Sequence, residues 1–288
     1  MLIDSHQHTN WHGKDCDAVV ANMDAAGIDV SWLLSWEVPE GEYDPGYNGI
    51  FDPRDIGMPF TRIIHACERH PKRFVAGFAP DPRRPDAIER LEAAVRMHKV
   101  RVYGELKIRI LFDDPDVLRM FKRCGELKLP VVFHIDIPAA ERPKPPSRDY
   151  WYCVDIDKLE TALKACPETI FVGHAPGFWR HISGDGYTAA GAYPKGEVTP
   201  GGRVQQLMRA YPNLYADLSA GSGLTAISRP PVGQGRNFLL EFQDKLLFGR
   251  DCFDDRLMTF IKSQDLPREA FEKLAYRNAL KLVPLDGD

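Results

Sequence analysis

The sequence has no cluster of cysteines and no long apolar run. Its six cysteines are scattered along the chain, and no two of them form a C-x-x-C pair. We therefore expect reduced thiols and a cytoplasmic protein instead of a disulfide framework. No segment approaches the roughly 20 apolar residues of a transmembrane helix, and the chain opens on an apolar segment without a basic leader. These features argue against a membrane as partner.

The sequence also lacks an excess of basic residues. Its 37 Lys and Arg stand against 41 Asp and Glu, which gives a net charge of −4. Nucleic acid or an anionic membrane would select a basic surface, so we expect a small-molecule substrate and no nucleic acid. Assembly into a homo-oligomer stays open. A length of 288 residues suits one large α/β barrel or two ordinary domains.

The chain alternates short apolar runs with amphipathic stretches. The runs of strand character cover residues 1–6, 30–36, 73–79, 102–108, 130–135, 169–174, 214–220 and 245–251. Most are nearly continuous in apolar residues, as in strands that are buried on both faces of a parallel sheet. Stretches of helical character lie at 17–28, 84–98, 114–128 and 154–167, each with Gly or Pro near one end.

Eight strands alternating with helices indicate right-handed βαβ units. The fold class is therefore predicted to be α/β, a (β/α)8 TIM barrel that forms a single domain over residues 1–288, with an open doubly wound sheet as the competing solution. Four long segments rich in polar residues, Gly or Pro follow predicted strands, at 37–59, 138–153, 175–202 and 221–236. In a barrel these loops emerge at the C-terminal mouth, where active sites are built.

Polar residues close several of the predicted strands. His6 and His8 end the first strand and lie on the same side by alternation, with Asp4 on that face as a supporting partner. His134 and His174 end two successive later strands. Each histidine alone is as well explained as an ordinary loop or core residue.

Asp251 ends the last strand, where it could also cap the helix that follows. A barrel brings residues at the C-terminal ends of its strands within a few ångströms of each other. The histidines and Asp251 together therefore predict a divalent metal site with an open position. Such N and O ligands suit Zn²⁺ first, with Mn²⁺ or Fe²⁺ as alternatives, and one or two ions.

This pattern resembles the amidohydrolase superfamily, specifically its branch of small amidohydrolase 2 barrels. The resemblance spans the whole chain, and residues 276–282 are similar to the closing N-A-x-x-L helix of that branch. It implies that His6, His8 and His134 are metal ligands and that Asp251 is both ligand and general base. His174 would be a further ligand or a catalytic group that polarises the substrate.

The fourth strand leaves alternatives open. Glu105, Lys107 and Arg109 share one face by alternation. Some superfamily members bridge two metals with a carbamylated lysine here, and others, which resemble TatD-type deoxyribonucleases, use the glutamate of a G-E motif. A simple Glu–Lys ion pair is the ordinary explanation. We expect Glu105 to be an accessory ligand, Lys107 to be its neighbour or a catalytic substrate contact, and Arg109 to bind a substrate carboxylate.

Two tryptophans, Trp36 and Trp179, lie near the mouth and are expected to form an aromatic wall for the substrate. The predicted function is hydrolysis of a C–N or C–O bond in a small polar amide, lactone or ester by a metal-activated water. The alternative within the same branch is a metal-dependent decarboxylase of an aromatic or unsaturated acid. A barrel without turnover and a nuclease fit the ligand set and the charge less well.

Overall fold

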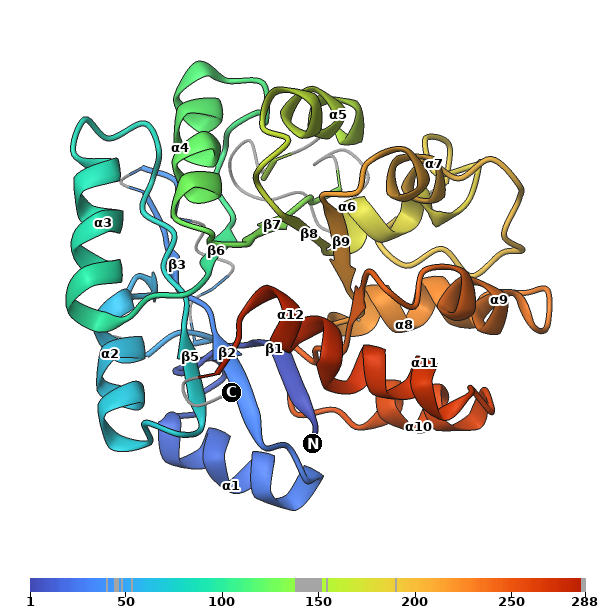
Figure 1. The fold of residues 1–288 in the computed structure, drawn as a ribbon, viewed down its shortest axis with the longest axis horizontal. Helices are drawn as coiled ribbons and strands as arrows, with labels where there is room; N and C mark the ends of the chain where they lie inside the picture. The colour runs from blue at the N-terminus through green and yellow to red at the C-terminus, as the bar shows by residue number, and fades with distance from the viewer. Residues whose placement is uncertain are drawn as a thin grey trace.

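The computed structural model of the chain describes residues 1–39, 41–43, 47, 49–52, 54–137, 152–153, 155–189 and 191–285. Parallel strands form a ring that helices surround (Figure 1). In the described residues the strands of the ring are β1 (Ile3–Gln7), β2 (Val30–Leu33), β5 (Phe74–Ala76), β6 (Tyr103–Leu106), β7 (Val131–His134), β8 (Phe171–His174), β9 (Leu214–Asp217) and β10 (Leu246–Leu247). Each overlaps one predicted strand, so the (β/α)8 barrel is confirmed.

The ring consists of two parallel sheets, which are ordered β1-β2-β5 and β10-β9-β8-β7-β6. They meet on one side through a parallel bridge between Gly77 and Val102. On the other side the backbone N–H of Ser5 donates to the carbonyl of Phe248 at 2.9 Å. Neighbouring strands therefore follow chain order around the ring, as successive βαβ units require.

The helices start and stop where local chemistry predicts. Asp15 caps the first helix by accepting from the backbone N–H of Ala18, and Gly27 ends it in the left-handed conformation with φ 67°. Pro115 opens the helix that Asp114 caps. The α-helices in the described residues are α1 (Cys16–Ala26), α2 (Phe60–Arg69), α3 (Ala87–His98), α4 (Pro115–Glu126), α5 (Ile156–Ala165), α6 (Pro176–Trp179), α7 (Arg203–Ala210), α8 (Ala220–Ser228), α9 (Gln234–Glu241), α10 (Arg256–Ser263), α11 (Arg268–Glu272) and α12 (Asn278–Leu282).

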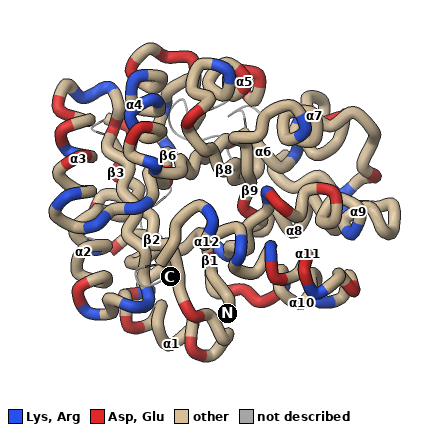
Figure 2. Tube along the Cα trace, viewed as in Figure 1, with Lys and Arg blue, Asp and Glu red and all other residues tan. Residues whose placement is uncertain are grey.

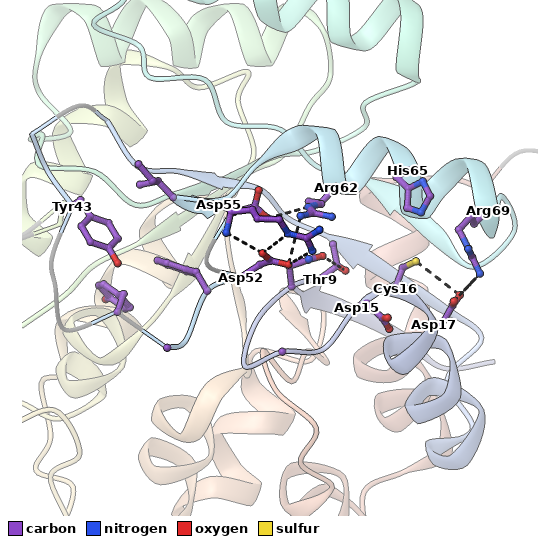
Figure 3. Close-up of a pocket in the computed structure, with 17 residues that line it drawn as sticks. Thr9, Asp15, Cys16, Asp17, Tyr43, Asp52, Asp55, Arg62, His65 and Arg69 are labelled. Atoms are coloured by element: carbon purple, nitrogen blue, oxygen red, sulfur yellow. Dashed lines mark hydrogen bonds and ion pairs between the residues drawn. The ribbon is translucent and has the colours of Figure 1, made fainter.

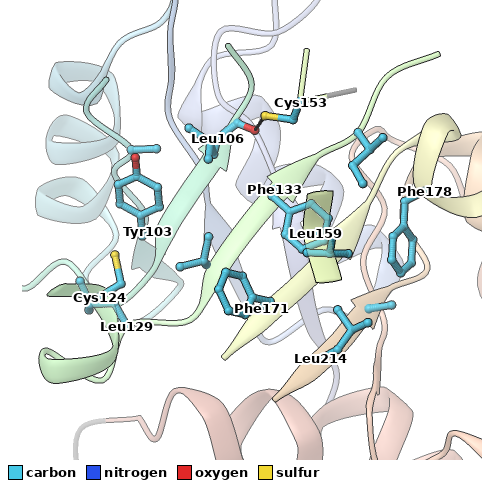
Figure 4. Packing of buried hydrophobic residues seen from close by; sticks show 14 of the residues in the cluster. Tyr103, Leu106, Cys124, Leu129, Phe133, Cys153, Leu159, Phe171, Phe178 and Leu214 are labelled. Carbon is cyan, nitrogen blue, oxygen red and sulfur yellow. Dashed lines mark hydrogen bonds between the residues drawn. The ribbon is translucent and has the colours of Figure 1, made fainter. Parts of the chain in front are cut away.

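Two hydrophobic cores hold the barrel together. The larger one lies between the strands and the outer helices, where Phe133 and Phe171 pack with Leu159 of α5 (Figure 4). The smaller one takes apolar residues from or beside each strand of the ring, such as Val132 and Val172, together with Ala279 of α12. Helix α12 lies in the middle of the ring in Figure 1. The barrel interior is thus packed by apolar side chains. Side chains alternate along a strand, so the residues two positions after Val132 and Val172, which are His134 and His174, lie on the same face closer to the mouth.

Some predicted loops differ from the structure. The segment after β2 contains an antiparallel pair, β3 (Trp36–Glu37) with β4 (Gly57–Met58). Residues 221–236, predicted as a mouth loop because of their polar, Gly and Pro content, instead form most of α8 and the start of α9. Most of the predicted loop 138–153 lies outside the described residues.

The outer helices carry interspersed charges of both signs, as α3, α4, α10 and α11 show in Figure 2. This mixture agrees with the net charge of −4 and is typical of a solvated surface. Among the described residues, no helix is both long enough and apolar enough to cross a membrane.

Candidate metal centre

Two imidazoles at the end of β1 form the middle of the candidate site. The Nε2 atoms of His6 and His8 lie 3.3 Å apart, and both rings are buried. The Nδ1 atom of His8 donates to the carbonyl oxygen of Leu34 at 2.8 Å. Nδ1 of His6 lies 2.9 Å from the carboxylate of Asp217. Because both Nδ1 atoms face acceptors, both Nε2 atoms present their lone pairs to the same point.

Two carboxylates from other strands reach the same point. Nε2 of His8 lies 3.2 Å from Oδ1 of Asp251 and 3.4 Å from Oε2 of Glu105. Nε2 of His6 lies 3.8 Å and 3.9 Å from the same two oxygens. The side chain of Asp251 is 24% exposed, whereas that of Glu105 is almost fully buried. Asp251 therefore faces both the histidines and the solvent at the mouth.

The two histidines of the later strands flank this group from the other side. Nδ1 of His134 lies 2.6 Å from Oε1 of Glu105. Nε2 of His174 lies 3.7 Å from the same oxygen and 3.9 Å from Oδ2 of Asp251. The structure thus brings together six of the residues predicted from the sequence. Their roles as ligands, base or polarising group stay predictions.

A buried carboxylate that was not predicted from the sequence contacts two of the histidines. Asp217, at the end of β9, accepts from Nδ1 of His6 through Oδ2 and from Nδ1 of His174 through Oδ1, at 2.9 Å and 3.0 Å. Ser219 also donates to Oδ1, through its backbone N–H and its hydroxyl. A signal was present, because Asp217 closes its strand as His134 and His174 close theirs.

The electrostatics of the group favour a bound cation. Burial alone would lower the pKa of His6, but the neighbouring carboxylates, Asp217 first, raise it well above the usual value. Burial alone would raise the pKa of Glu105, but His134, His6 and His8 hold it well below its usual range. Asp251 also has a lowered pKa, because the hydrogen bond from His8 and the nearby imidazoles outweigh its burial. The carboxylates are therefore ionised, and their negative charge favours a proton or another cation at the imidazole nitrogens.

This donor set fits a divalent transition metal. Two lone pairs that face each other at 3.3 Å repel unless a cation or proton lies between them. Ligands bound at about 2.0–2.2 Å in a tetrahedral site lie roughly 3.3–3.6 Å from each other, which is close to the separations around His8. Imidazole nitrogens with carboxylate oxygens, and an exposed edge at Asp251, match an open catalytic site better than a closed structural one.

Comparisons with known proteins identify the family. The family model described as amidohydrolase matches residues 3–285. The chain belongs to the amidohydrolase family. A comparison with curated proteins gave no match.

Solved structures share the fold of this chain at low sequence identity. An uncharacterised TIM-barrel protein from Bordetella bronchiseptica has a TM-score of 0.65 and 14% identity, over 98% of this chain and 97% of that one. An amidohydrolase from Burkholderia multivorans with bound zinc has a TM-score of 0.63 and 14% identity, over 98% of both chains. A 2,6-dihydroxybenzoate decarboxylase from Rhizobium has a TM-score of 0.57 and 15% identity, over 99% of this chain and 98% of that one. At these identities the likeness establishes the barrel alone.

Lys107 lies beside an aromatic group. Its ammonium nitrogen is 4.2 Å from the ring centroid of Trp36 and within 6 Å of those of Tyr47 and Tyr152. The indole N–H of Trp36 donates to the carbonyl of Lys107 at 2.6 Å. The charge of Lys107 also contributes, after burial, to lowering the pKa of His134 to about 4. The cation therefore acts on the edge of the candidate site.

The other two predicted substrate contacts have different surroundings. Trp179 is 1% exposed, and its indole N–H donates to the carbonyl of Asp217 at 3.0 Å. It is therefore a buried support of Asp217 in this structure and not part of an open aromatic wall, and Trp36 is equally buried at 1%. The backbone N–H of Arg109 donates to Glu42, whereas its Nε and Nη2 atoms are buried without a hydrogen-bond partner. In the part of the chain that the structure describes, neither side chain contacts the six residues that converge at the candidate site.

The carboxylate of Asp4 does not support the imidazoles. Arg250 donates to it through Nε and through its backbone N–H, each at 2.9 Å. This pair lies behind the site and joins β1 to the residues that follow β10. Asp217 takes the supporting position that the alternation of β1 suggested for Asp4.

Tyr193, from the loop after β8, is a further mouth residue that the sequence did not single out. Its ring edge approaches Gly221 at the start of α8, and it is 48% exposed. Partial burial raises its pKa, and the charges of Asp251 and Asp136 add to this effect. The phenol is therefore protonated at neutral pH and can donate to a bound substrate.

A separate cavity of about 970 Å³ lies beside the barrel mouth (Figure 3). Its arginines are paired with lining carboxylates, as in the contacts of Arg62 with Asp55 at 2.9 Å and of Arg69 with Asp17 at 2.6 Å. Asp17 also forms a possible ligand group with Cys16 and His70. The guanidinium on Asp17 already neutralises this carboxylate, so the group is a poor cation site. None of the six residues of the candidate metal site lines this cavity.

Proposed function

We propose that this amidohydrolase binds a divalent metal ion, Zn²⁺ first, and hydrolyses a C–N or C–O bond of a small polar amide, lactone or ester. The ligands would be His6, His8 and Asp251, with Glu105 as an accessory ligand. The observation that carries the proposal is the convergence of two histidine lone pairs and two ionised carboxylates at one partly open point. The zinc described in the Burkholderia multivorans amidohydrolase of the same fold supports it.

When bound, such an ion lowers the pKa of a coordinated water from about 15.7 toward roughly 7 and polarises a substrate carbonyl. Asp251 combines a contact to His8 with solvent exposure, so it can accept a proton from water and later return it to the leaving group. His174 has its Nδ1 held by Asp217, which aims Nε2 at the reacting region. There it can stabilise negative charge that develops on the substrate oxygen.

The donors also allow a second ion. Glu105, His134 and His174 form a ligand group of their own, next to the group of His6, His8 and Asp251. Glu105 would then bridge the two positions, since one of its oxygens faces His134 and the other faces His8. One or two ions are therefore proposed, and metal analysis decides between them.

A decarboxylase is the second candidate. The ammonium of Lys107 near His134 offers a counter-charge for a carboxylate, and a barrel of this fold from Rhizobium is described as a 2,6-dihydroxybenzoate decarboxylase. The groups proposed for hydrolysis would then orient an acid instead of a carbonyl.

A substrate panel tests the two candidates. The zinc-loaded protein would be incubated with small lactones, esters and amides, and separately with aromatic carboxylic acids. We expect hydrolysis in the first set that a chelator removes and that returned zinc restores. Release of CO₂ from the second set, without hydrolysis in the first, would replace the hydrolase with the decarboxylase. Protein that binds no divalent metal would overturn both.

A further inference from the structure

We propose that Asp217 is a positioning residue that fixes the hydrogen position on His6 and thereby makes its Nε2 atom available to a metal. The inference rests on the proposed function for the identity of the ligands. It goes beyond that function, because the carboxylate of Asp217 contacts the Nδ1 atoms of His6 and His174 and not the Nε2 atoms that face Glu105 and Asp251. Its effect is expected to reach the metal through one histidine and not through the other.

The carboxylate of Asp217 serves two imidazoles at once. Oδ2 accepts from Nδ1 of His6 at 2.9 Å, and Oδ1 accepts from Nδ1 of His174 at 3.0 Å. The rings of these two histidines lie 4.0 Å apart, with 32° between their planes. A single ionised carboxylate therefore requires a hydrogen on Nδ1 in both rings, which leaves both Nε2 atoms free to accept.

The two oxygens of Asp217 are not equivalent. Oδ1 also accepts from Ser219, through the backbone N–H at 3.1 Å and through the hydroxyl at 2.5 Å. Oδ2 accepts from His6 alone among the recorded contacts of the described residues. The whole group is buried, and Trp179 holds the carbonyl of Asp217 in place. The carboxylate therefore cannot rotate to exchange its two oxygens without losing the hydrogen bonds from Ser219.

This asymmetry predicts how an amide would sit at position 217. An asparagine has one oxygen and one NH₂ group, so it can accept on one side only. The backbone N–H of Ser219 requires the oxygen at the Oδ1 position, and the NH₂ group then faces Nδ1 of His6. Two donors cannot face each other in a buried site, so His6 must move its hydrogen to Nε2. An Nε2 atom that carries a hydrogen cannot bind a metal.

The experiment is a double-mutant cycle on zinc affinity, measured by competition with a chromophoric chelator. We expect Asp217→Asn to weaken zinc binding by about 10–100-fold. In a His6→Ala background the same change should not weaken zinc binding further, because the imidazole through which Asp217 acts on the metal is absent. In a His174→Ala background its full effect should remain.

Asp4→Asn is the matched control. Asp4 is equally buried and lies two residues before His6, but its carboxylate accepts from Arg250 and from the backbone N–H of His6, and not from an imidazole ring. The same chemical change there should leave zinc affinity close to that of the wild type. Circular dichroism checks that each variant is folded, and Asp217→Ala replaces Asp217→Asn in the cycle if the latter fails to fold.

Unchanged affinity in Asp217→Asn would overturn the proposal, and so would a loss that adds fully to that of His6→Ala. A separate readout does not depend on the metal. Nitrogen-15 NMR of labelled histidines, at a pH high enough that the imidazole signals no longer move, should place the hydrogen of His6 on Nδ1 in the wild type and on Nε2 in Asp217→Asn. If the wild type binds no zinc, the proposed function fails and this readout alone decides the role of Asp217.

Discussion

The carboxylate of Glu105 joins two parts of the barrel mouth. Oε1 lies 2.6 Å from Nδ1 of His134, and Oε2 lies 3.4 Å from Nε2 of His8. One residue of β6 thus contacts histidines from both β7 and β1. Because its pKa is well below the usual range, the carboxylate is ionised and can act as an acceptor on both sides.

Replacing Glu105 distinguishes the alternatives for the fourth strand. If Glu105 is a ligand, Glu105→Gln should weaken metal binding by roughly 10-fold or more, measured by chelator competition. If Glu105 only pairs with Lys107, metal affinity should hold and the free energy of unfolding should fall by about 3–5 kcal/mol. The double variant Glu105→Gln, Lys107→Met should then regain stability. Activity that depends on bicarbonate, with two bound ions, would instead identify a carbamylated Lys107.

The histidines of β1 are expected to be required for metal binding. Purified protein should carry about one equivalent or more of a divalent transition metal by elemental analysis. His6→Ala together with His8→Ala should abolish this binding, because both converging nitrogen donors are lost. His98→Ala is the control, because His98 lies on α3 away from the candidate site and packs against Phe60, so this variant should retain the metal. Equal metal content in the double variant and the control would contradict the assignment.

Asp251 should matter more for turnover than for folding. Asp251→Asn retains a carbonyl oxygen that can face the metal but cannot accept the proton, so we expect activity to fall by at least about 100-fold. The melting temperature and much of the metal content should be kept. The assay uses whichever substrate of the panel the wild type converts. An Asn variant with near-normal turnover would remove Asp251 from the role of base.

Metal affinity should depend on pH in a stated direction. The pKa values of His6 and His8 are raised above the usual 6.5 in the metal-free protein, since the nearby carboxylates outweigh burial. Below these raised values protons occupy the nitrogens that the metal needs, so affinity should fall as pH is lowered from 9 to 6. Zinc binding in weak buffer at neutral pH should release protons, which an indicator dye detects. Affinity that is constant over this range would contradict the raised values.

Lys107 should affect the binding of substrates that carry a carboxylate. Removing its charge in Lys107→Met should raise KM for acidic substrates by about 10-fold and change KM for neutral substrates little, because only the acids gain from the counter-charge. The exposed Lys122→Met on α4 is the matched control. An equal change in KM for both substrate classes would point to a structural role beside Trp36.

The sequence determined the barrel and most of the site. Apolar runs and the Gly and Pro signals placed all eight strands of the ring, because a strand that is buried on both faces of a parallel sheet needs a nearly continuous run of apolar residues. Residues at the C-terminal ends of barrel strands meet at the mouth, and this rule brought together His6, His8, His134, His174 and Asp251. Alternation was needed only to place His6 and His8 on the same side. Loop content was less informative, since small residues such as Gly223 in α8 serve close packing as readily as a turn.

Only the tertiary structure decided which groups support the site. Alternation along β1 suggested Asp4 as the partner of the imidazoles, but the residues that surround each carboxylate come from distant parts of the chain. Arg250 takes Asp4, and Asp217 takes the two histidines. Trp179 likewise looked like a mouth residue in the sequence and is buried against Asp217. Hydrogen bonds between residues 211 and 246 positions apart depend on how the strands are arranged around the ring, which no local pattern records.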